Sequence, residues 1–232
     1  MREIVFDTET TGLDPFTGDR LVEIGCIELV NGFLTGQEFH RYVNPQRDMP
    51  DGAFQVHGLS AEFLKDKPLF SDICEDLLAF IGDAPLVAHN AMFDLGFLNA
   101  ELDRCKRALV ARERIVDTLM LARRKHSAGP YSLDALCTRY SIDNSMRTKH
   151  GALMDAELLA KVYLELTGRR QATLSLIDDN RAMAQSGFGI AIVQVRPMPL
   201  VPRVSDAERE AHLTFVGTLG EKAIWKDYLP AA

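Results

Sequence analysis

Two carboxylates, one residue apart, directly follow a short apolar run near the N-terminus, and this feature constrains the chain most. Residues 4–6 predict a buried strand, and Asp7 and Glu9 follow it in the motif Asp-Thr-Glu-Thr-Thr-Gly. Residues i and i+2 of a strand point to the same side of a sheet, so the two carboxylates aim at one point. Their repulsion there is costly unless a cation or proton lies between them. Such oxygen ligands suit Mg²⁺ or Mn²⁺, although a solvated acidic turn at Gly12 explains the hexapeptide equally well.

Two segments further along the chain carry acids in suitable contexts. Residues 86–94 read as a strand, a turn and the first turn of a helix containing Asp94, where the helix dipole favours an acid in any case. Asp155 lies in a strongly apolar helix predicted for residues 152–166 and needs a partner, because a buried unpaired charge is costly. His150 and Asp155 are separated by about 140° of helical rotation, so they cannot share one helix face. We therefore place His150 on a loop before the helix.

The three blocks, Asp-x-Glu, Asn-x-x-x-Asp and His-x-x-x-x-Asp, occur in an order that resembles the DEDD exonuclease superfamily in its histidine subclass. Within that superfamily the chain is similar to the family of epsilon proofreading subunits of bacterial DNA polymerase III. The similarity runs from about residue 2 to residue 168 and continues more faintly into the C-terminus. Its motifs are residues 6–13, 56–59, 89–97, 132–137 and 150–155.

The resemblance implies a metal-dependent 3′–5′ exodeoxyribonuclease that removes mispaired 3′-terminal nucleotides as 5′-mononucleotides. Two ions, Mg²⁺ or Mn²⁺, would lie about 3.5–4 Å apart. Asp7, Glu9 and Asp155 would bind one ion directly. Asp7 would bridge to the second ion, which Asp94 would support largely through water. His150 would be the general base that takes a proton from the metal-bound water.

A pocket for the terminal nucleotide is also implied by the resemblance. His57, in a segment that reads as a loop, favours contact with the substrate. For Leu13, Val56 and Phe93, packing in the core is nearly as good an interpretation. The implied lining residues are Thr10, Thr11, Gly12, Leu13, Val56, His57 and Phe93.

Alternating strands and helices predict an α/β fold, and the resemblance implies a ribonuclease-H-like exonuclease fold with a mixed central sheet and flanking helices. Asn31-Gly32 is typical of a hairpin turn. Ser71 can cap a helix that ends at Gly82. The expected strands are residues 3–6, 21–29, 33–42, 86–88 and 114–116, and the other expected helices are residues 94–106, 132–140 and 152–166.

The charge balance excludes a protein that wraps duplex DNA with basic patches. The 232 residues include 26 basic and 33 acidic side chains, a net charge of −7, whereas such proteins are strongly basic. Four well-separated cysteines predict reduced core thiols. The absence of a signal peptide and of a long apolar segment predicts a cytoplasmic protein. The basic residues 123–125 and 147–149 are expected in loops, where they form a solvated face or steer a DNA strand.

Four parts are expected along the chain: an exonuclease domain over residues 1–170, a sliding-clamp motif over 171–177, a linker over 178–204 and a tail over 205–232. Gln171, Leu174 and Leu176 are similar to clamp-binding motifs, although they also fit the end of the last helix. Gly and Pro residues interrupt the linker. No membrane association is expected.

The tail opens with a capping box, Ser205 followed three residues later by Glu208. An apolar stripe continues to Gly220 and needs a surface to bury against. By the resemblance, the tail binds the catalytic (alpha) subunit of DNA polymerase III, with Phe215, Leu219 and Trp225 as its anchors.

Two alternatives remain open for the whole chain. One is an RNA-trimming exonuclease of the same superfamily, which would not need the linker and tail. The other is a non-catalytic adaptor between polymerase and clamp, which the complete set of acids disfavours. The preferred substrate is a single-stranded or frayed 3′ DNA end.

Overall fold

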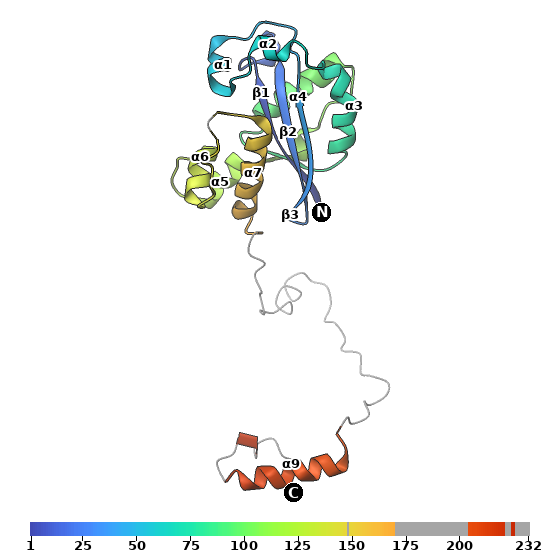
Figure 1. Cartoon of the computed structure of the whole chain (residues 1–232), viewed down its shortest axis with the longest axis vertical. Helices are drawn as coiled ribbons and strands as arrows, with labels where there is room; N and C mark the ends of the chain where they lie inside the picture. The colour runs from blue at the N-terminus through green and yellow to red at the C-terminus, as the bar shows by residue number, and fades with distance from the viewer. Residues whose placement is uncertain (148, 170–203, 221–223, 226–232) are drawn as a thin grey trace. The chain divides into compact units, whose positions relative to one another are not determined.

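Five strands form a mixed sheet at the centre of the first of two units, Met1–Leu174 (Figure 1). A computed structural model describes residues 1–147, 149–169, 204–220 and 224–225. The strand order is β3-β2-β1-β4-β5, with antiparallel pairing on the β3 side of β1 and parallel pairing on the β5 side. The strands are β1 (Arg2–Thr10), β2 (Leu21–Val30), β3 (Phe33–Tyr42), β4 (Leu86–Ala88) and β5 (Ile115–Asp117).

Seven α-helices are described in the same unit, and α9 (Asp206–Thr218) is described in the second unit, Ser175–Ala232. None of the helices in the described ranges has the length and apolarity to cross a bilayer. The predicted α/β fold with a mixed sheet and flanking helices is confirmed. The helices of the first unit are α1 (Asp51–His57), α2 (Ala61–Leu64), α3 (Phe70–Ile81), α4 (Met92–Arg104), α5 (Thr118–Lys125), α6 (Leu133–Arg139) and α7 (Ala152–Leu166).

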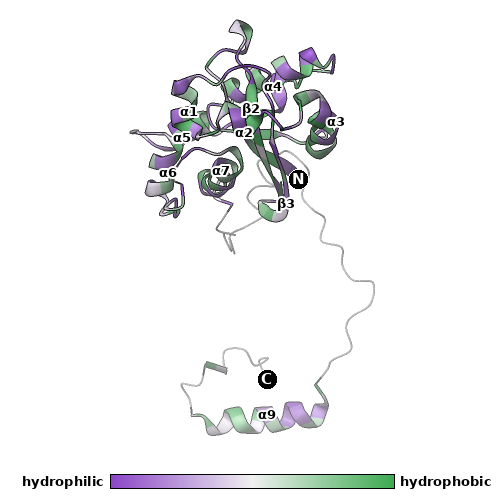
Figure 2. Ribbon diagram, turned by 45° about the horizontal axis from the view of Figure 1, so that its top comes forward, coloured by the Kyte–Doolittle hydropathy of each residue, from purple (hydrophilic) through white to green (hydrophobic). Residues whose placement is uncertain are grey.

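Alternation along β1 divides the apolar core into two layers. Ile4 and Phe6 pack into a cluster with α3 and α4, whereas Val5 packs into a second cluster with α6 and α7. Figure 2 shows hydrophobic residues in the strands and on parts of the surrounding helices. Because side chains alternate along a strand, the odd-numbered residues of β1 face α7. Asp7 and Glu9 therefore point to the side from which α7 contributes its own acid.

Gly25 of β2 allows α7 to approach the sheet closely. It pairs with Asp7 across the β1–β2 ladder. A Cβ atom at this position would lie 2.4 Å from the backbone nitrogen of Leu153 and 2.5 Å from the carbonyl carbon of Ala152. Glycine in a strand is typical of such a close backbone approach. The first turn of α7 thus rests directly on the strand beside Asp7.

We expect Gly25→Ala to destabilise the protein by about 1–3 kcal/mol, the usual cost of forcing extra atoms into a packed core. Hydrolysis should fall further than the loss of folded protein explains, because α7 must move away from β1. Gly96→Ala is the matched control, since a Cβ at Gly96 meets no neighbouring atom within 4 Å. Thermal unfolding and single-turnover hydrolysis measure the two effects. Equal activity per folded molecule in both variants would contradict this role of Gly25.

Several predicted boundaries need correction. β1 continues to Thr10 rather than ending at residue 6, so both acids lie inside the strand. Ser71 does not cap α3, which begins at Phe70; the Asp72 carboxylate instead accepts a hydrogen bond from the Leu69 amide. The hairpin at Asn31-Gly32 is confirmed, since both residues have positive φ angles. All four cysteines are free thiols.

The basic residues 123–125 do not lie in a loop, as expected, but form the last turn of α5. The Lys125 ammonium donates hydrogen bonds to the carbonyl oxygens of Glu165 and Leu166 at 2.5 and 3.0 Å. Cations are favoured at a helix C-terminus, where carbonyl groups lack partners within the helix. Lys125 therefore holds the end of α7.

Candidate active site

The four acids predicted as metal ligands line one pocket of about 290 Å³, which we call the acidic pocket, together with a fifth acid, Asp134. Asp7 and Glu9 come from β1, Asp94 from the first turn of α4, and Asp155 from the first turn of α7. His150 lies just before α7, as predicted, and also lines this pocket. The structure therefore brings together all five predicted catalytic and metal-binding residues.

Asp94 reaches the pocket from the α4 side of the sheet. Its Oδ1 accepts hydrogen bonds from the Thr8 amide at 3.1 Å and the Thr8 hydroxyl at 2.8 Å. The turn before α4 contains Asn90, which has a positive φ of 62°. Its backbone N–H donates a hydrogen bond to Asp117 Oδ1. Thr8 therefore fixes an acid that belongs to the opposite layer from Asp155.

Burial and mutual repulsion make these acids reluctant to carry charge. Burial, followed by the charges of Asp94, Glu9 and Asp155, raises the pKa of Asp7 well above its usual range. Burial and the charge of Asp155 raise the pKa of Glu9 to about 8. Burial raises the pKa of Asp94 to about 7, although the Thr8 hydrogen bonds oppose the increase. A cation among these oxygens would reverse the penalty.

The raised pKa of Glu9 predicts how stability depends on pH in the presence of a chelator. The pKa of Glu9 is about 8 in the folded chain against an ordinary 4.5. The stability that protonated Glu9 contributes is therefore fully present below pH 4.5 and is lost as the pH rises through 8. Glu9→Gln removes the titrating group. We therefore expect the melting temperature of Glu9→Gln to increase relative to that of wild type as the pH rises across this window. Mg²⁺ should reduce this difference. A constant difference from pH 4.5 to 8 would contradict this electrostatic picture.

Arg147 is the cation that the structure places in the acidic pocket. Its Nε and Nη2 atoms donate to the two carboxylate oxygens of Asp155 at 2.5 and 2.6 Å. The sequence indicated that Asp155 needs a partner but assigned Arg147 to a basic loop that is solvated or steers DNA. The expectation of a solvated position is wrong, since only 8% of the Arg147 side chain is exposed.

Three potential metal ligands lie especially close together among the described residues. One ligand atom each from Glu9, His150 and Asp155 falls within 4.8 Å of the others. His150 Nδ1 is 3.2 Å from Asp155 Oδ2. Asp7 and Asp94 line the same pocket outside this tight group. The donor set of carboxylates with one imidazole fits a hard divalent ion.

A second pocket of about 510 Å³ adjoins the acidic pocket, and Thr8, Glu9 and Phe93 line both. Core packing does not account for Leu13 or Val56, which are 84% and 48% exposed. The structure thus brings the seven predicted substrate-binding residues together around one hollow. They are Thr10, Thr11, Gly12, Leu13, Val56, His57 and Phe93.

His57 lies at the end of α1, not in a loop as the sequence indicated. The helix ends there because Gly58 adopts a left-handed conformation, with φ 75°. Only 6% of His57 is exposed, and burial lowers its pKa. Nδ1 accepts a hydrogen bond from the Leu59 amide, so the proton is on Nε2. Nε2 is buried and makes no hydrogen bond of standard geometry, but an interaction with the Thr10 backbone opposes the lowering of the His57 pKa by burial.

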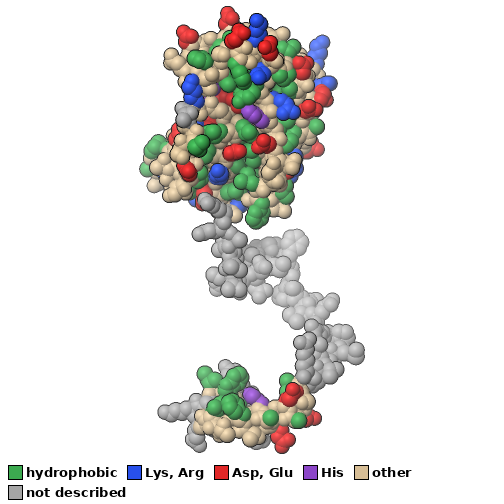
Figure 3. Space-filling model, in the orientation of Figure 1, with side chains coloured by type: hydrophobic (Ala, Val, Ile, Leu, Met, Phe, Trp, Pro, Cys, Tyr) green, Lys and Arg blue, Asp and Glu red, His purple; other side chains and the backbone are tan. Residues whose placement is uncertain are grey.

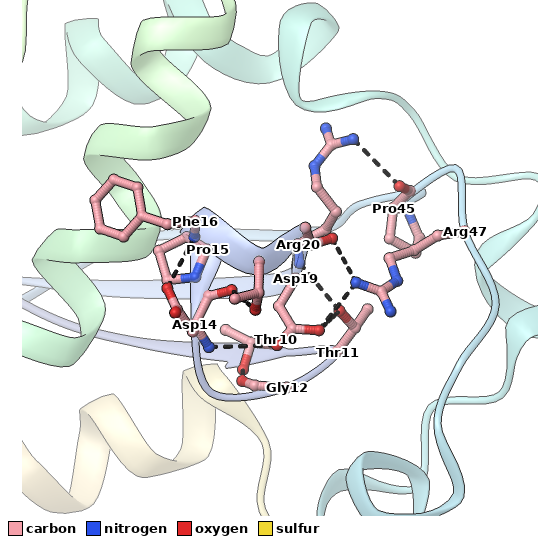
Figure 4. Close-up of polar contacts among 12 residues, drawn as sticks. Thr10, Thr11, Gly12, Asp14, Pro15, Phe16, Asp19, Arg20, Pro45 and Arg47 are labelled. Atoms are coloured by element: carbon pink, nitrogen blue, oxygen red, sulfur yellow. Dashed lines mark hydrogen bonds and ion pairs between the residues drawn. The ribbon is translucent and has the colours of Figure 1, made fainter.

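The loop after β1 forms one wall of the adjoining pocket, and Asp19 organises it (Figure 4). Asp19 Oδ1 accepts hydrogen bonds from the Thr11 hydroxyl at 3.2 Å and from Arg47 at 2.9 Å. A Cβ on Gly12 would lie 2.2 Å from the Asp19 carboxylate, so a larger residue there would have to displace the Asp19 side chain. The Thr10 hydroxyl donates to the Gly12 carbonyl. These contacts hold a narrow loop that presents Leu13 outward.

The second unit places the predicted polymerase-binding residues at its surface. Ser205 and Glu208 form the predicted capping box at the start of α9. Phe215, Leu219 and Trp225 are 60%, 46% and 54% exposed, and Figure 3 shows hydrophobic side chains on the surface of this unit. The clamp-motif residues Gln171, Leu174 and Leu176 lie outside the described residues, as does nearly all of the linker.

Comparison with known sequences connects this geometry to a family. The chain matches the exonuclease family RNase_T over residues 4–163. The DNA polymerase III subunit epsilon of Rickettsia felis is 56% identical over 181 residues, which cover 77% of this chain and 79% of that protein. The corresponding subunit of Rickettsia typhi is 49% identical over 219 residues, which cover 93% and 96% of the two chains.

Solved structures share the fold of the first unit. Exonuclease X in complex with 5′ overhanging duplex DNA matches with a TM-score of 0.54 at 25% identity, covering 72% of this chain and 91% of that chain. The nuclease domain of 3′hExo, a DEDDh family member bound to rAMP, matches with a TM-score of 0.63 at 14% identity, covering 72% and 92%. The sheet and helices therefore have the DEDDh exonuclease arrangement.

Proposed function

Because this chain belongs to the family of DNA polymerase III epsilon subunits, and is therefore a 3′–5′ proofreading exonuclease, we propose that its acidic pocket binds two divalent ions, Mg²⁺ or Mn²⁺. The convergence of four carboxylates, with the pKa values of Asp7, Glu9 and Asp94 all raised, is the observation that carries this proposal. The donors fit such ions. Asp7, Glu9 and Asp155 hold the first ion, and Asp7 and Asp94 support the second.

Bound there, the ions would activate a water molecule and stabilise the leaving 3′ oxygen. The chain itself supplies the proton acceptor and the substrate pocket. His150 is close enough to the carboxylate group to take a proton from the attacking water. The adjoining pocket takes the terminal nucleotide, with Leu13, Val56 and Phe93 against its base and sugar.

Selection of mispaired ends follows from the shape of the site. A terminal nucleotide must leave the duplex to enter the adjoining pocket, and mispaired bases unstack at lower cost. The chain thereby favours frayed 3′ ends without reading base identity. With a net charge of −7 the chain has little general attraction for phosphates. A tether to the polymerase raises the local concentration of the primer end instead.

The experiment that tests this function is a mass-spectrometric digest of a primer with a mismatched 3′ end. Mg²⁺, Mn²⁺ and chelator arms identify the metal requirement, and an RNA oligonucleotide of the same sequence tests the preference for DNA. We expect 5′-mononucleotides released from the 3′ end of DNA with metal and none with chelator. Faster trimming of the RNA would favour an exoribonuclease, and metal-independent release would exclude the two-metal proposal.

The exposed apolar residues of the second unit and the clamp-like motif support two partners for this chain. We place the polymerase catalytic subunit on the exposed residues of the second unit and the sliding clamp on Gln171, Leu174 and Leu176, which have the clamp-motif spacing. The place of action is then the bacterial cytoplasm, where replication occurs.

Joint replacement of Phe215 and Trp225 by alanine should weaken binding to the polymerase catalytic subunit by about tenfold or more, since buried aromatic anchors dominate interfaces. Hydrolysis of a short free oligonucleotide should not change. His212, whose ring contacts the Trp225 ring edge-on, is left unchanged in the double variant. Thr214→Ala, on the same helix as Phe215, is the control. Calorimetric titration measures the affinity. Unchanged affinity in the double variant would place the polymerase contact elsewhere.

A further inference from the structure

Arg147 holds the proposed metal ligand Asp155 through both of its carboxylate oxygens. The planar guanidinium donates two nearly parallel hydrogen bonds, from Nε to Oδ1 at 2.5 Å and from Nη2 to Oδ2 at 2.6 Å. Only 3% of the Asp155 side chain and 8% of the Arg147 side chain are exposed. Charge-assisted bidentate pairs of this kind are the strongest side-chain hydrogen bonds.

The same guanidinium also engages the proposed base. Arg147 Nη2 lies 2.8 Å from His150 Nδ1. The same imidazole nitrogen is 3.2 Å from Asp155 Oδ2. His150 Nδ1 therefore faces the guanidinium and a carboxylate, so Arg147 occupies the space from which a water molecule would reach this nitrogen.

We propose that Arg147 is a positioning residue that competes with the divalent ion for Asp155 and releases His150 only when the ion replaces it. The inference rests on the metal-binding function proposed above. One cation, the guanidinium, neutralises the acidic pocket until another, the ion, takes over Asp155. Metal binding and the freeing of the base are then one event, which prevents the base from acting at an incompletely loaded site.

A second carboxylate keeps the displaced arginine nearby. Arg147 Nη1 donates to Asp134 Oδ1 at 2.7 Å, and Asp134 lies in the first turn of α6, outside the proposed ligand set. Its side chain is 56% exposed, so it remains in contact with solvent. Loss of the Asp155 contact therefore does not send Arg147 into solvent. The guanidinium stays at the rim of the acidic pocket, paired with Asp134.

The test is calorimetric titration of Mn²⁺ into the full-length protein without DNA. Arg147→Met removes the competing cation but keeps most of the side-chain length, and we expect it to bind Mn²⁺ about tenfold or more tightly, because a charged hydrogen-bonded pair no longer has to be broken. Arg147→Lys keeps the positive charge but cannot donate two parallel hydrogen bonds to Asp155. Its Mn²⁺ affinity should lie between those of wild type and Arg147→Met. If Arg147→Met does not fold, the comparison of Arg147→Lys with wild type tests the proposal.

Lys149→Met is the matched control, because it removes a positive charge from the same loop. Its ammonium lies over the Phe54 ring at 5.2 Å rather than on an acid. Its Mn²⁺ affinity should stay within about twofold of wild type, well short of the tenfold change expected when a charged pair is lost. If the Lys149 and Arg147 variants gained Mn²⁺ affinity equally, the change in net charge alone would explain the effect, which would contradict the proposal. Unchanged or weaker binding by both Arg147 variants would overturn the proposal. If wild type itself bound no Mn²⁺, the metal-binding function would fail instead.

Imidazole nitrogen NMR gives a readout that metal affinity alone does not. In wild type, Mg²⁺ should shift the His150 Nδ1 resonance as the Arg147 hydrogen bond is lost. In Arg147→Met, that resonance should already be at the shifted position before Mg²⁺ is added. A wild-type resonance insensitive to Mg²⁺ would show that the ion and the base are not coupled through Arg147.

Discussion

Asp7→Ala is expected to abolish hydrolysis while leaving the protein folded. Asp7 lines the acidic pocket, where burial and three neighbouring carboxylates raise its pKa. If Asp7 bridges two ions as proposed, its loss removes several kilocalories per mole of transition-state stabilisation, which corresponds to about 10³-fold or more in rate. Removal of a repelled carboxylate should leave the melting temperature equal to or above that of wild type in chelator. Single-turnover hydrolysis and thermal unfolding measure the two quantities.

Asp76→Ala is the matched control for this variant, since Asp76 is an exposed acid on α3 far from the acidic pocket. It should retain wild-type rate and metal dependence. Near-normal, metal-dependent turnover by Asp7→Ala would show that Asp7 is not a metal ligand. A large loss of stability in chelator would show instead that Asp7 is part of the structural core.

His150→Ala should slow cleavage by roughly 10²–10⁴-fold, the usual contribution of a general base. Metal affinity should change much less, because carboxylates provide most of the ligand oxygens. The pH–rate profile should lose the acidic limb that protonation of the base produces. His126→Ala is the control, since His126 contacts the Tyr140 hydroxyl outside the acidic pocket. An acidic limb that persists in His150→Ala would assign the proton transfer to another group.

Strands and acids could be read from the sequence because they depend on local patterns. The boundaries of β3, β4 and α7 agree with the prediction. The Asn31-Gly32 turn marks the start of β3, a short apolar run marks β4, and a long apolar helix marks α7. The Asp-x-Glu spacing correctly placed two carboxylates on one face of β1. Helix α1 was missed because it has seven residues and buries only His57. Without an apolar stripe, no helical periodicity is visible in so short a segment.

Contacts between distant segments could not be read in this way. The sequence indicated that Asp155 needs a partner, but several basic residues fit that description equally well until the loop before α7 is placed. Gly25 carried a usable signal, because glycine in the middle of a strand is unfavourable unless another backbone lies close by. The partner, the start of α7, is more than one hundred residues away in the chain, and only the fold identifies it.

The loop that carries His150 is attached to α1 through its backbone, since the His150 amide donates a hydrogen bond to the Val56 carbonyl at 3.3 Å. Val56 also lines the adjoining pocket. A nucleotide bound in this pocket would therefore contact the same residue that anchors the His150 loop, so occupancy of the pocket and the position of the proposed base would share one point of attachment.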